Sequence, residues 1–205
     1  NTYAVVVRAS DSLGVWTDRA MTVTVTAVNE PPTVAAPATP YAASEGIALS
    51  LTGTGLSIAD VDAGNGAVQL TLGVASGVLN ASAGTSGAAV SGSGSGTVVL
   101  TGTVAQIDAL LAGGGGATLT YLMSAAVPPA SDTLTLTVND QGNSGAGGPL
   151  SATASVGIAI TAVDNAPSVI APAGATVAEG ATLVFSAASS NAIVVGDPDA
   201  GAAPV

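Results

Sequence analysis

Two carboxylates stand two residues apart in the stretch Asp60-Val61-Asp62-Ala63-Gly64-Asn65-Gly66, and residues that favour turns follow them directly. Nearly the same letters return at Asp197-Pro198-Asp199-Ala200-Gly201, 137 positions later (197 − 60 = 137). A turn of this kind presents hard oxygen ligands to a hard cation. Because its copy lies one domain length away, the sequence predicts a tandem array of similar units.

Two further motifs repeat at almost the same distance. Glu45-Gly46 returns as Glu179-Gly180, 134 positions later (179 − 45 = 134). Asn29-Glu30-Pro31-Pro32 is matched by Asp164-Asn165-Ala166-Pro167. We expect both of these segments to be short, stiff linkers, because proline fixes φ and removes a backbone donor.

The two linkers divide the chain into three predicted segments. Residues 1–30 are expected to be the C-terminal hairpin of a preceding repeat with its linker. Residues 31–165 form one complete repeat, and residues 166–205 form the N-terminal part of the next. We therefore interpret the sequence as a piece of a longer polypeptide.

Most of the chain has the two-residue alternation of half-buried β-strands. It is clear in Ala20 to Val28 (AMTVTVTAV) and in Thr133 to Val138 (TLTLTV). One stretch differs: residues 104–112 (VAQIDALLA) have apolar residues on one helical face. The predicted fold class is all-β, with Ig-like or cadherin-like β-sandwich repeats in tandem and one short helix per repeat. A β-solenoid would need a much shorter period.

The composition excludes several classes of function. Cysteine and histidine are both absent, which removes disulfides, thiolate zinc sites and histidine-activated nucleophiles. Two basic residues against thirteen acidic ones give a net charge of −11, so a nucleic-acid partner is not expected. No apolar run reaches the roughly 18 residues of a membrane span, so no membrane insertion is expected in this segment. We predict a protein without enzymatic activity.

The direction of the predicted strands sorts the acidic residues into two poles of the complete repeat. The loop that follows each strand lies either at the end of the repeat next to the preceding linker or at the end next to the following linker. The first joint is predicted to gather Asn29, Glu30, Asp60, Asp62 and Asp140. The second joint is predicted to gather Glu45, Asp164, Asn165, Asp197 and Asp199, which Asp132 could join from the foot of its strand.

Carboxylates gathered in this way repel one another unless a cation lies between them. Six to eight oxygen ligands suit Ca²⁺, whereas Mg²⁺ accepts fewer protein ligands, so Ca²⁺ is the predicted ligand of both joints. Simpler interpretations also fit. Asp60 and Asp62 could form a turn held by Asx hydrogen bonds, and the loop around Asp140 allows the same. Asp108 is expected to be a solvated helix residue, and Trp16 to pack in the core or a loop.

Several motifs resemble the cadherin-like tandem repeats of giant bacterial adhesins, the RTX or type I-secreted class. The resemblance rests on both Asp-x-Asp turns, both Glu-Gly turns and the following segments: Ala9-Ser10-Asp11-Ser12-Leu13-Gly14, Val28-Asn29-Glu30-Pro31-Pro32, the helix at 103–112, Val138-Asn139-Asp140-Gln141-Gly142 and Val163-Asp164-Asn165-Ala166-Pro167. The acidic Asp-Arg-Glu triplet of animal cadherins is absent, which leaves the number of calcium ions per joint open.

The resemblance implies a secreted protein of the cell surface, whose repeats form an arm that extends a distal binding domain for adhesion. Its partners would then be the neighbouring repeats of the same chain. Two alternatives stay open. Like chains could pack laterally in an extracellular filament or sheath. A carbohydrate-binding module is the other, and it would need an exposed aromatic patch.

Overall fold

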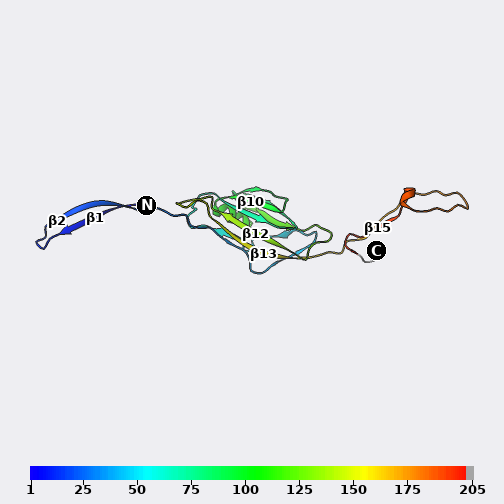
Figure 1. Ribbon diagram of the computed structural model, residues 1–205, viewed down its shortest axis with the longest axis horizontal. Coiled ribbons are helices and arrows are strands. Elements are labelled where there is room, and N and C mark those ends of the chain that lie inside the picture. Colours follow the sequence, from blue (N-terminus) through cyan, green and yellow to red (C-terminus); the bar gives the residue numbers. More distant parts are fainter. Residues whose placement is uncertain (202–205) are drawn as a thin grey trace.

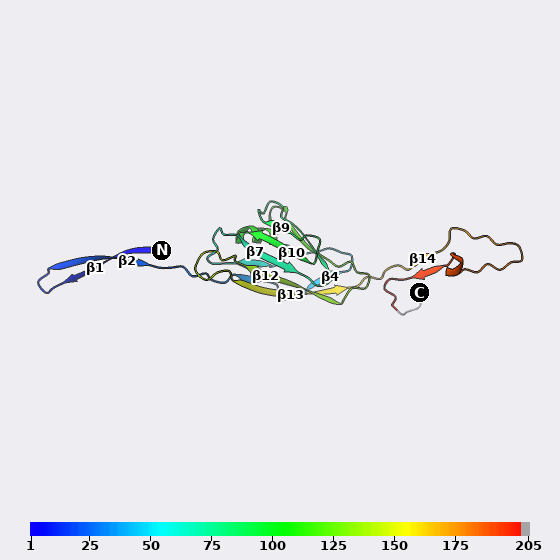
Figure 2. The same ribbon diagram turned by 45° about the horizontal axis from the view of Figure 1, so that its top comes forward.

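The computed structural model describes residues 1–201, so residues 202–205 of the predicted third segment lie outside the described residues. Three parts follow one another along the long axis of the molecule (Figure 1). A hairpin forms the N-terminal part, a β-rich body forms the middle, and an extended segment forms the C-terminal part. The view turned by 45° shows the same order (Figure 2).

A six-stranded sheet is the largest element of the central body. Its strands, in spatial order, are β4 (Tyr41–Ser44), β13 (Ser151–Thr161), β12 (Ser131–Asn139), β7 (Val68–Gly73), β10 (Thr97–Gly102) and β9 (Ala89–Ser91). All neighbouring pairs are antiparallel except β13 and β4, which run parallel with Ile158 opposite Tyr41 and Thr161 opposite Ser44.

Two smaller sheets complete the body. A three-stranded sheet has the order β5 (Leu49–Ser50), β11 (Thr118–Leu122) and β8 (Val78–Ser82). β3 (Thr33–Ala35) pairs with β6 (Ser57–Ala59) in a two-stranded sheet next to the first linker. The segment 47–58 contains β5 and the start of β6, and Gly53 and Gly55 adopt positive φ values between these two strands.

The predicted helix is present as α1 (Val104–Leu111), followed by a 3-10 turn, η1 (Gly114–Gly116). Thr103 caps it: its side chain accepts a hydrogen bond from the Gln106 amide, and the Gln106 side chain accepts one from the Thr103 amide. Ile107, Leu110 and Leu111 are buried on one face, in agreement with the helical spacing seen in the sequence.

The hydrophobic core is one cluster of buried residues that includes side chains from the six-stranded and three-stranded sheets. The alternation of β12 decides which side chains enter it: Leu134, Leu136 and Val138 are buried, while Thr133 and Thr135 are exposed. Residues from both sheets and from α1 belong to one continuous buried cluster. The predicted all-β class is therefore confirmed at the level of a β-rich fold with one short α-helix.

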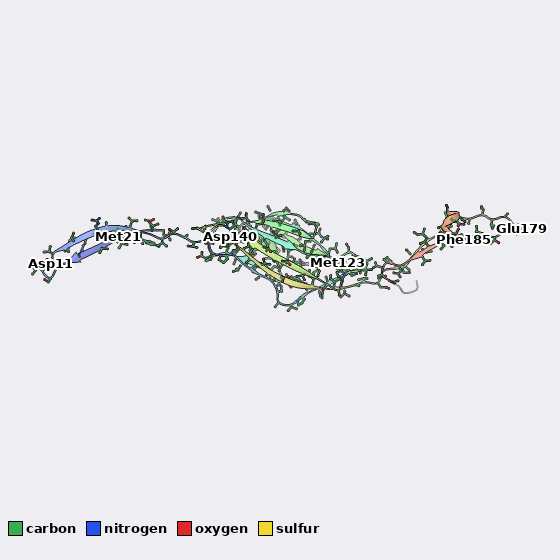
Figure 3. All side chains as sticks on the ribbon, in the orientation of Figure 1. Asp11, Met21, Met123, Asp140, Glu179 and Phe185 are labelled. Carbon is green, nitrogen blue, oxygen red and sulfur yellow. The ribbon has the colours of Figure 1, made fainter. Side chains whose placement is uncertain are left out.

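Each flanking part contains a pair of strands. β1 (Thr2–Ser10) and β2 (Trp16–Thr24) form the N-terminal hairpin, whose strands pair along their full length. β14 (Ser168–Ile170) and β15 (Val194–Gly196) pair in the C-terminal part, which also contains η2 (Ala187–Ser189). Asp11 and Glu179 mark the two far tips of the molecule (Figure 3).

Candidate functional site

The first linker is bound to the central body by the side chain of Asn29, which is only 5% exposed. Its Nδ2 atom donates one hydrogen bond to Oδ2 of Asp140, at 2.6 Å, and another to the carbonyl oxygen of Gly148, at 2.9 Å. Asp140 follows the end of β12 and lies at the end of the body that faces the N-terminal hairpin (Figure 3). The structure thus brings these two predicted residues together.

Asp60 and Asp62 lie on the loop that follows β6, and backbone amides hold them. The Glu30 amide donates to Oδ2 of Asp62 at 3.0 Å, which attaches the linker to this loop. The Asp62 and Ala63 amides donate to Oδ1 of Asp60 at 3.1 and 3.0 Å. The turn therefore has the Asx hydrogen bonds of the simpler interpretation, and the same bonds fix the carboxylates beside the linker.

Three side-chain oxygens at this joint are buried without a hydrogen-bond partner: Oδ1 of Asn29, Oδ2 of Asp60 and Oδ1 of Asp62. They are the only such atoms within residues 1–201. The orientation of the Asn29 amide follows from chemistry, because both of its close partners are acceptors and so face its nitrogen. Its oxygen must then point elsewhere. Buried polar atoms without partners are costly, so these three atoms require an explanation.

The electrostatics of the two turn carboxylates differ. The pKa of Asp60 is raised, mainly by burial and to a smaller extent by the neighbouring side chain of Asp62. The hydrogen bond from the Glu30 amide is the main factor that lowers the pKa of Asp62. At neutral pH the pair presents negative charge, and the surroundings of Asp60 make its ionised form less favourable. A cation beside both groups would offset this effect.

Asp140 is fully buried and its carboxylate is well satisfied. Oδ1 accepts hydrogen bonds from the amides of Gly142 and Leu150, both at 2.8 Å. Burial would raise the pKa of Asp140, but these bonds and the one from Asn29 outweigh it and lower the pKa. Asp140 therefore holds the joint together through hydrogen bonds to the protein itself.

The second joint repeats part of this arrangement. The Asn165 amide donates to Oδ2 of Asp199 at 2.7 Å, and the Asp199 amide donates to Oδ1 of Asp197 at 3.3 Å. Glu45 is buried and accepts from the Val163 amide at 3.0 Å and from Nδ2 of Asn165 at 3.1 Å. The structure thus brings together four of the five residues predicted for this joint.

The remaining predicted ligands are exposed. Glu30 is exposed at the first joint, where its backbone amide donates a hydrogen bond to Asp62. Asp164 is exposed at the second. At this joint the side chain of Asp199 is the main factor that raises the pKa of Asp197, while the Asn165 amide lowers that of Asp199.

Asp132 does not join the second joint. Its buried carboxylate accepts hydrogen bonds from the amides of Thr133 and of residues 75–77, and from the hydroxyl of Tyr121 at 3.0 Å. Burial would raise the pKa of Asp132, but the backbone hydrogen bonds outweigh it and lower the pKa. Asp132 thus anchors the loop after β7.

Two other expectations need correction. Asp108 is not simply a solvated helix residue, because its Oδ1 accepts a hydrogen bond from the Ile58 amide at 2.9 Å and so links α1 to β6. Trp16 is 55% exposed rather than packed in a core. The guanidinium carbon of Arg8 lies 3.9 Å from the centre of its ring, and Arg8 also pairs with Asp18 at 2.7 Å.

The donor set of the first joint combines carboxylate and amide oxygens. Within residues 1–201, no group of three or more His, Cys, Asp or Glu side chains is placed to hold a metal ion. The three unpartnered oxygens belong to two aspartates, Asp60 and Asp62, and to one asparagine, Asn29. A surface hollow of ≈ 240 Å³ borders the joint and is lined by residues 31, 33 and 59–61.

Comparisons with known proteins give little further information. No protein-family model and no curated protein sequence matches this chain. Similar solved structures include an endo-fucoidan hydrolase of glycoside hydrolase family 107, at 16% identity and a TM-score of 0.28, with 82% of this chain and 21% of that chain covered. Another similar solved structure is that of domains 4 and 5 of the S-layer protein SbsC, at 16% identity and a TM-score of 0.24, with 78% of this chain and 58% of that chain covered.

The chain spans about a fifth of the length of that hydrolase (21%) and just over half of the S-layer structure (58%). Similarity at these TM-scores carries no argument about fold or function. Across residues 1–201, no helix has the length and apolar character needed to cross a membrane.

Proposed function

We propose that this chain is a calcium-stiffened structural spacer of a bacterial cell-surface adhesin. It is built from cadherin-like β-sandwich repeats in tandem, and it extends a distal binding domain toward a cell or a surface. It works outside the cell, its partners are the neighbouring repeats of the same chain, and it performs no catalysis.

The observation that carries this proposal is the set of three unpartnered oxygens at the first joint. Asn29 precedes the two prolines of the linker, whereas Asp60 and Asp62 belong to the body that follows it. A cation bound to all three would connect the two sides of the linker. Ca²⁺ fits this donor set better than Mg²⁺, because it takes six to eight oxygens in flexible geometry. Water, backbone carbonyls and the exposed Glu30 carboxylate would complete the ligands.

The recurrence of one hydrogen-bond pattern supports the tandem arrangement. The bond from the Glu30 amide to Asp62 has its counterpart in the bond from the Asn165 amide to Asp199. The pairing of strands next to each linker also recurs, with Thr33 opposite Ala59 in the first case and Ser168 opposite Gly196 in the second. Two units that begin in the same way are what a tandem array requires.

The proposed role of the cation is electrostatic and mechanical. It neutralises Asp60 and Asp62, whose negative charges repel each other. Bending of the linker would then require coordination bonds to break. Because the cation binds the folded joint, it also stabilises the fold by mass action, by about 2.7 kcal/mol at a free concentration of 100 times Kd. Extracellular calcium modules bind with Kd values of roughly 10⁻⁴ to 10⁻³ M.

Calorimetric titration of the 205-residue chain with Ca²⁺ tests the proposal. Asp62→Asn should weaken binding by about tenfold or more, because it removes an oxygen ligand and a charge. Asp18→Asn is the matched control, since it makes the same chemical change on the hairpin, where Asp18 pairs with Arg8. Equal losses in both variants, or no binding by the parent chain at millimolar Ca²⁺, would contradict the proposal.

Small-angle scattering tests the mechanical part. With Ca²⁺ the maximum dimension should be larger and the curve that of a stiffer rod, whereas chelator should allow more bending, above all at the second joint. Superimposable curves under the two conditions would mean that the joints do not respond to the metal.

A further inference from the structure

The loop that joins β12 to β13 makes contact with the linker that precedes the body. We call residues 142–149 the latch loop. Its backbone has an unusual shape, because Gly142, Gly145, Gly147 and Gly148 all have positive φ, at 76°, 145°, 137° and 74°. Residues with side chains rarely adopt such values, so glycine is needed to build this loop.

Backbone hydrogen bonds attach the latch loop to the chain segment 27–29. The Asn29 amide donates to the carbonyl of Ala146 at 3.0 Å, and the Ala146 amide donates to the carbonyl of Ala27 at 3.0 Å. These bonds place Val28 opposite Ala146 in a parallel β-bridge. The Asn29 side chain adds its bond to the Gly148 carbonyl. All of these contacts join protein atoms directly.

Gly145 determines how closely the two segments approach. A Cβ atom at this position would lie 2.4 Å from the Asn29 nitrogen and 2.5 Å from the Val28 carbonyl carbon. Both are backbone atoms, which cannot rotate away as the end of a side chain can. The bridge therefore requires a residue without a side chain at position 145.

We infer that the latch loop fixes the direction of the first linker without any metal ion. The β-bridge to segment 27–29 fixes the direction in which the chain enters the body. The hydrogen bond from the Asn29 side chain to the Gly148 carbonyl reinforces this bridge. The latch and the proposed calcium site share Asn29 but use different atoms of it. The latch uses its backbone amide and Nδ2, whereas the calcium site would use its Oδ1 together with Asp60 and Asp62 on the other loop. Chelator should release that second loop while leaving the latch closed.

An engineered disulfide tests the latch directly. The natural chain has no cysteine, so Val28→Cys with Ala146→Cys introduces the only two thiols. Neighbouring strands lie about 4.7–4.9 Å apart, and disulfides join Cα atoms roughly 4.4–6.8 Å apart, so the two positions of this bridge suit a disulfide. The control is Val28→Cys with Ala130→Cys, since Ala130 precedes β12, at the other end of the body.

The readout is the rate of disulfide formation under mild oxidation in the presence of chelator, followed by thiol titration and electrophoresis. The latch pair should oxidise at least about tenfold faster than the control, because contact raises the effective concentration of the thiols. Calcium should leave this rate unchanged. A rate no faster than the control, or a fast rate that appears only with calcium, would overturn the inference.

A second test uses single glycine substitutions and residue-resolved amide exchange in chelator. The Asn29 amide should be protected in the parent chain, and Gly145→Ala should remove that protection. Gly148→Ala also places a side chain at positive φ, but no atom lies within 4 Å of its Cβ, so protection should remain. An unprotected Asn29 amide in the parent, or a protected one in Gly145→Ala, would contradict the latch. Neither test depends on whether calcium binds.

Discussion

Asn29 donates a 2.6 Å hydrogen bond to Asp140 across 111 positions of sequence, and both side chains are buried. This bond joins a residue two positions before the first linker proline to the residue that follows the end of β12. An amide is well suited to this place, because its nitrogen can serve the carboxylate of Asp140 while its oxygen stays available. The first two predictions follow from the charges around this joint.

Asn29→Asp should make the stability of the first joint depend more strongly on calcium than it does in the parent chain. The change replaces the donor with a second carboxylate next to Asp140, and two like charges at this distance repel. We expect a loss of about 1–3 kcal/mol of unfolding free energy in chelator, which millimolar Ca²⁺ restores in part. Thermal melting with and without Ca²⁺ measures this. The control is Asn29→Ala, which loses the hydrogen bonds without adding a charge and should not be rescued.

Asp60→Asn should have opposite effects with and without metal. Burial raises the pKa of Asp60, so its charged form is unfavourable in the folded protein, and this penalty is present above the raised pKa. The amide retains the Oδ1 acceptor and removes the charge. We expect a gain of roughly 0.5 kcal/mol in chelator, kept small by solvent screening, and lower stability than the parent at saturating Ca²⁺. Urea unfolding at pH 7 under both conditions measures the sign, and destabilisation in both would argue against a role in metal binding.

Asp132→Asn should destabilise the fold without affecting calcium affinity. Asparagine cannot accept all the hydrogen bonds that the carboxylate accepts from backbone amides and Tyr121, so some partly buried amides lose their partner. We expect a loss of about 2–3 kcal/mol, against about 1 kcal/mol for Tyr121→Phe, which removes a single bond. Urea unfolding gives both values, and calorimetry with Ca²⁺ should return the affinity of the parent chain.

The stability of the chain should decline in acid below the ordinary pKa of aspartate, about 3.9. The folded protein lowers the pKa of Asp132 and of Asp140. Each therefore contributes stability that is complete well above the unfolded pKa and is lost as the pH falls through the folded one. Unfolding free energies measured in chelator from pH 6 to pH 2 should show this fall. Asp132→Asn should flatten it, and an unchanged slope would contradict the assignment.

The sequence was sufficient to place most of the joint residues at the correct end of the body. Alternation identifies β12 and the segment that becomes β13, and the direction of each strand then follows from the linkers. This is why Asn29 and Asp140 could be assigned to one joint despite their separation. The reasoning works because strand direction is a property of topology, which a strand pattern and two linkers largely define.

Hydrogen-bond partners were much harder to anticipate. Nothing near Asp132 in the sequence indicates that the amides of residues 75–77 turn toward it, since that depends on the path of a distant loop. Likewise, the pattern that places Asp108 on α1 does not reveal Ile58 as its partner. The latch loop was missed for a related reason. Its glycines suggest flexibility, yet they allow the close approach to segment 27–29.

The parallel pairing of β4 with β13 has a consequence for a chain under tension. β4 follows β3, the first strand after the linker at one end of the body, and β13 leads into the linker at the other. Pulling on the two linkers would slide these strands past each other along their length, so the rungs of the ladder from Ile158–Tyr41 to Thr161–Ser44 would share the load. Strands loaded in shear must lose these rungs together, whereas a hairpin pulled open at its end loses them singly. The body should therefore unfold slowly when it is pulled by flow or traction. This mechanical resistance depends on its unfolding rate rather than on its equilibrium stability.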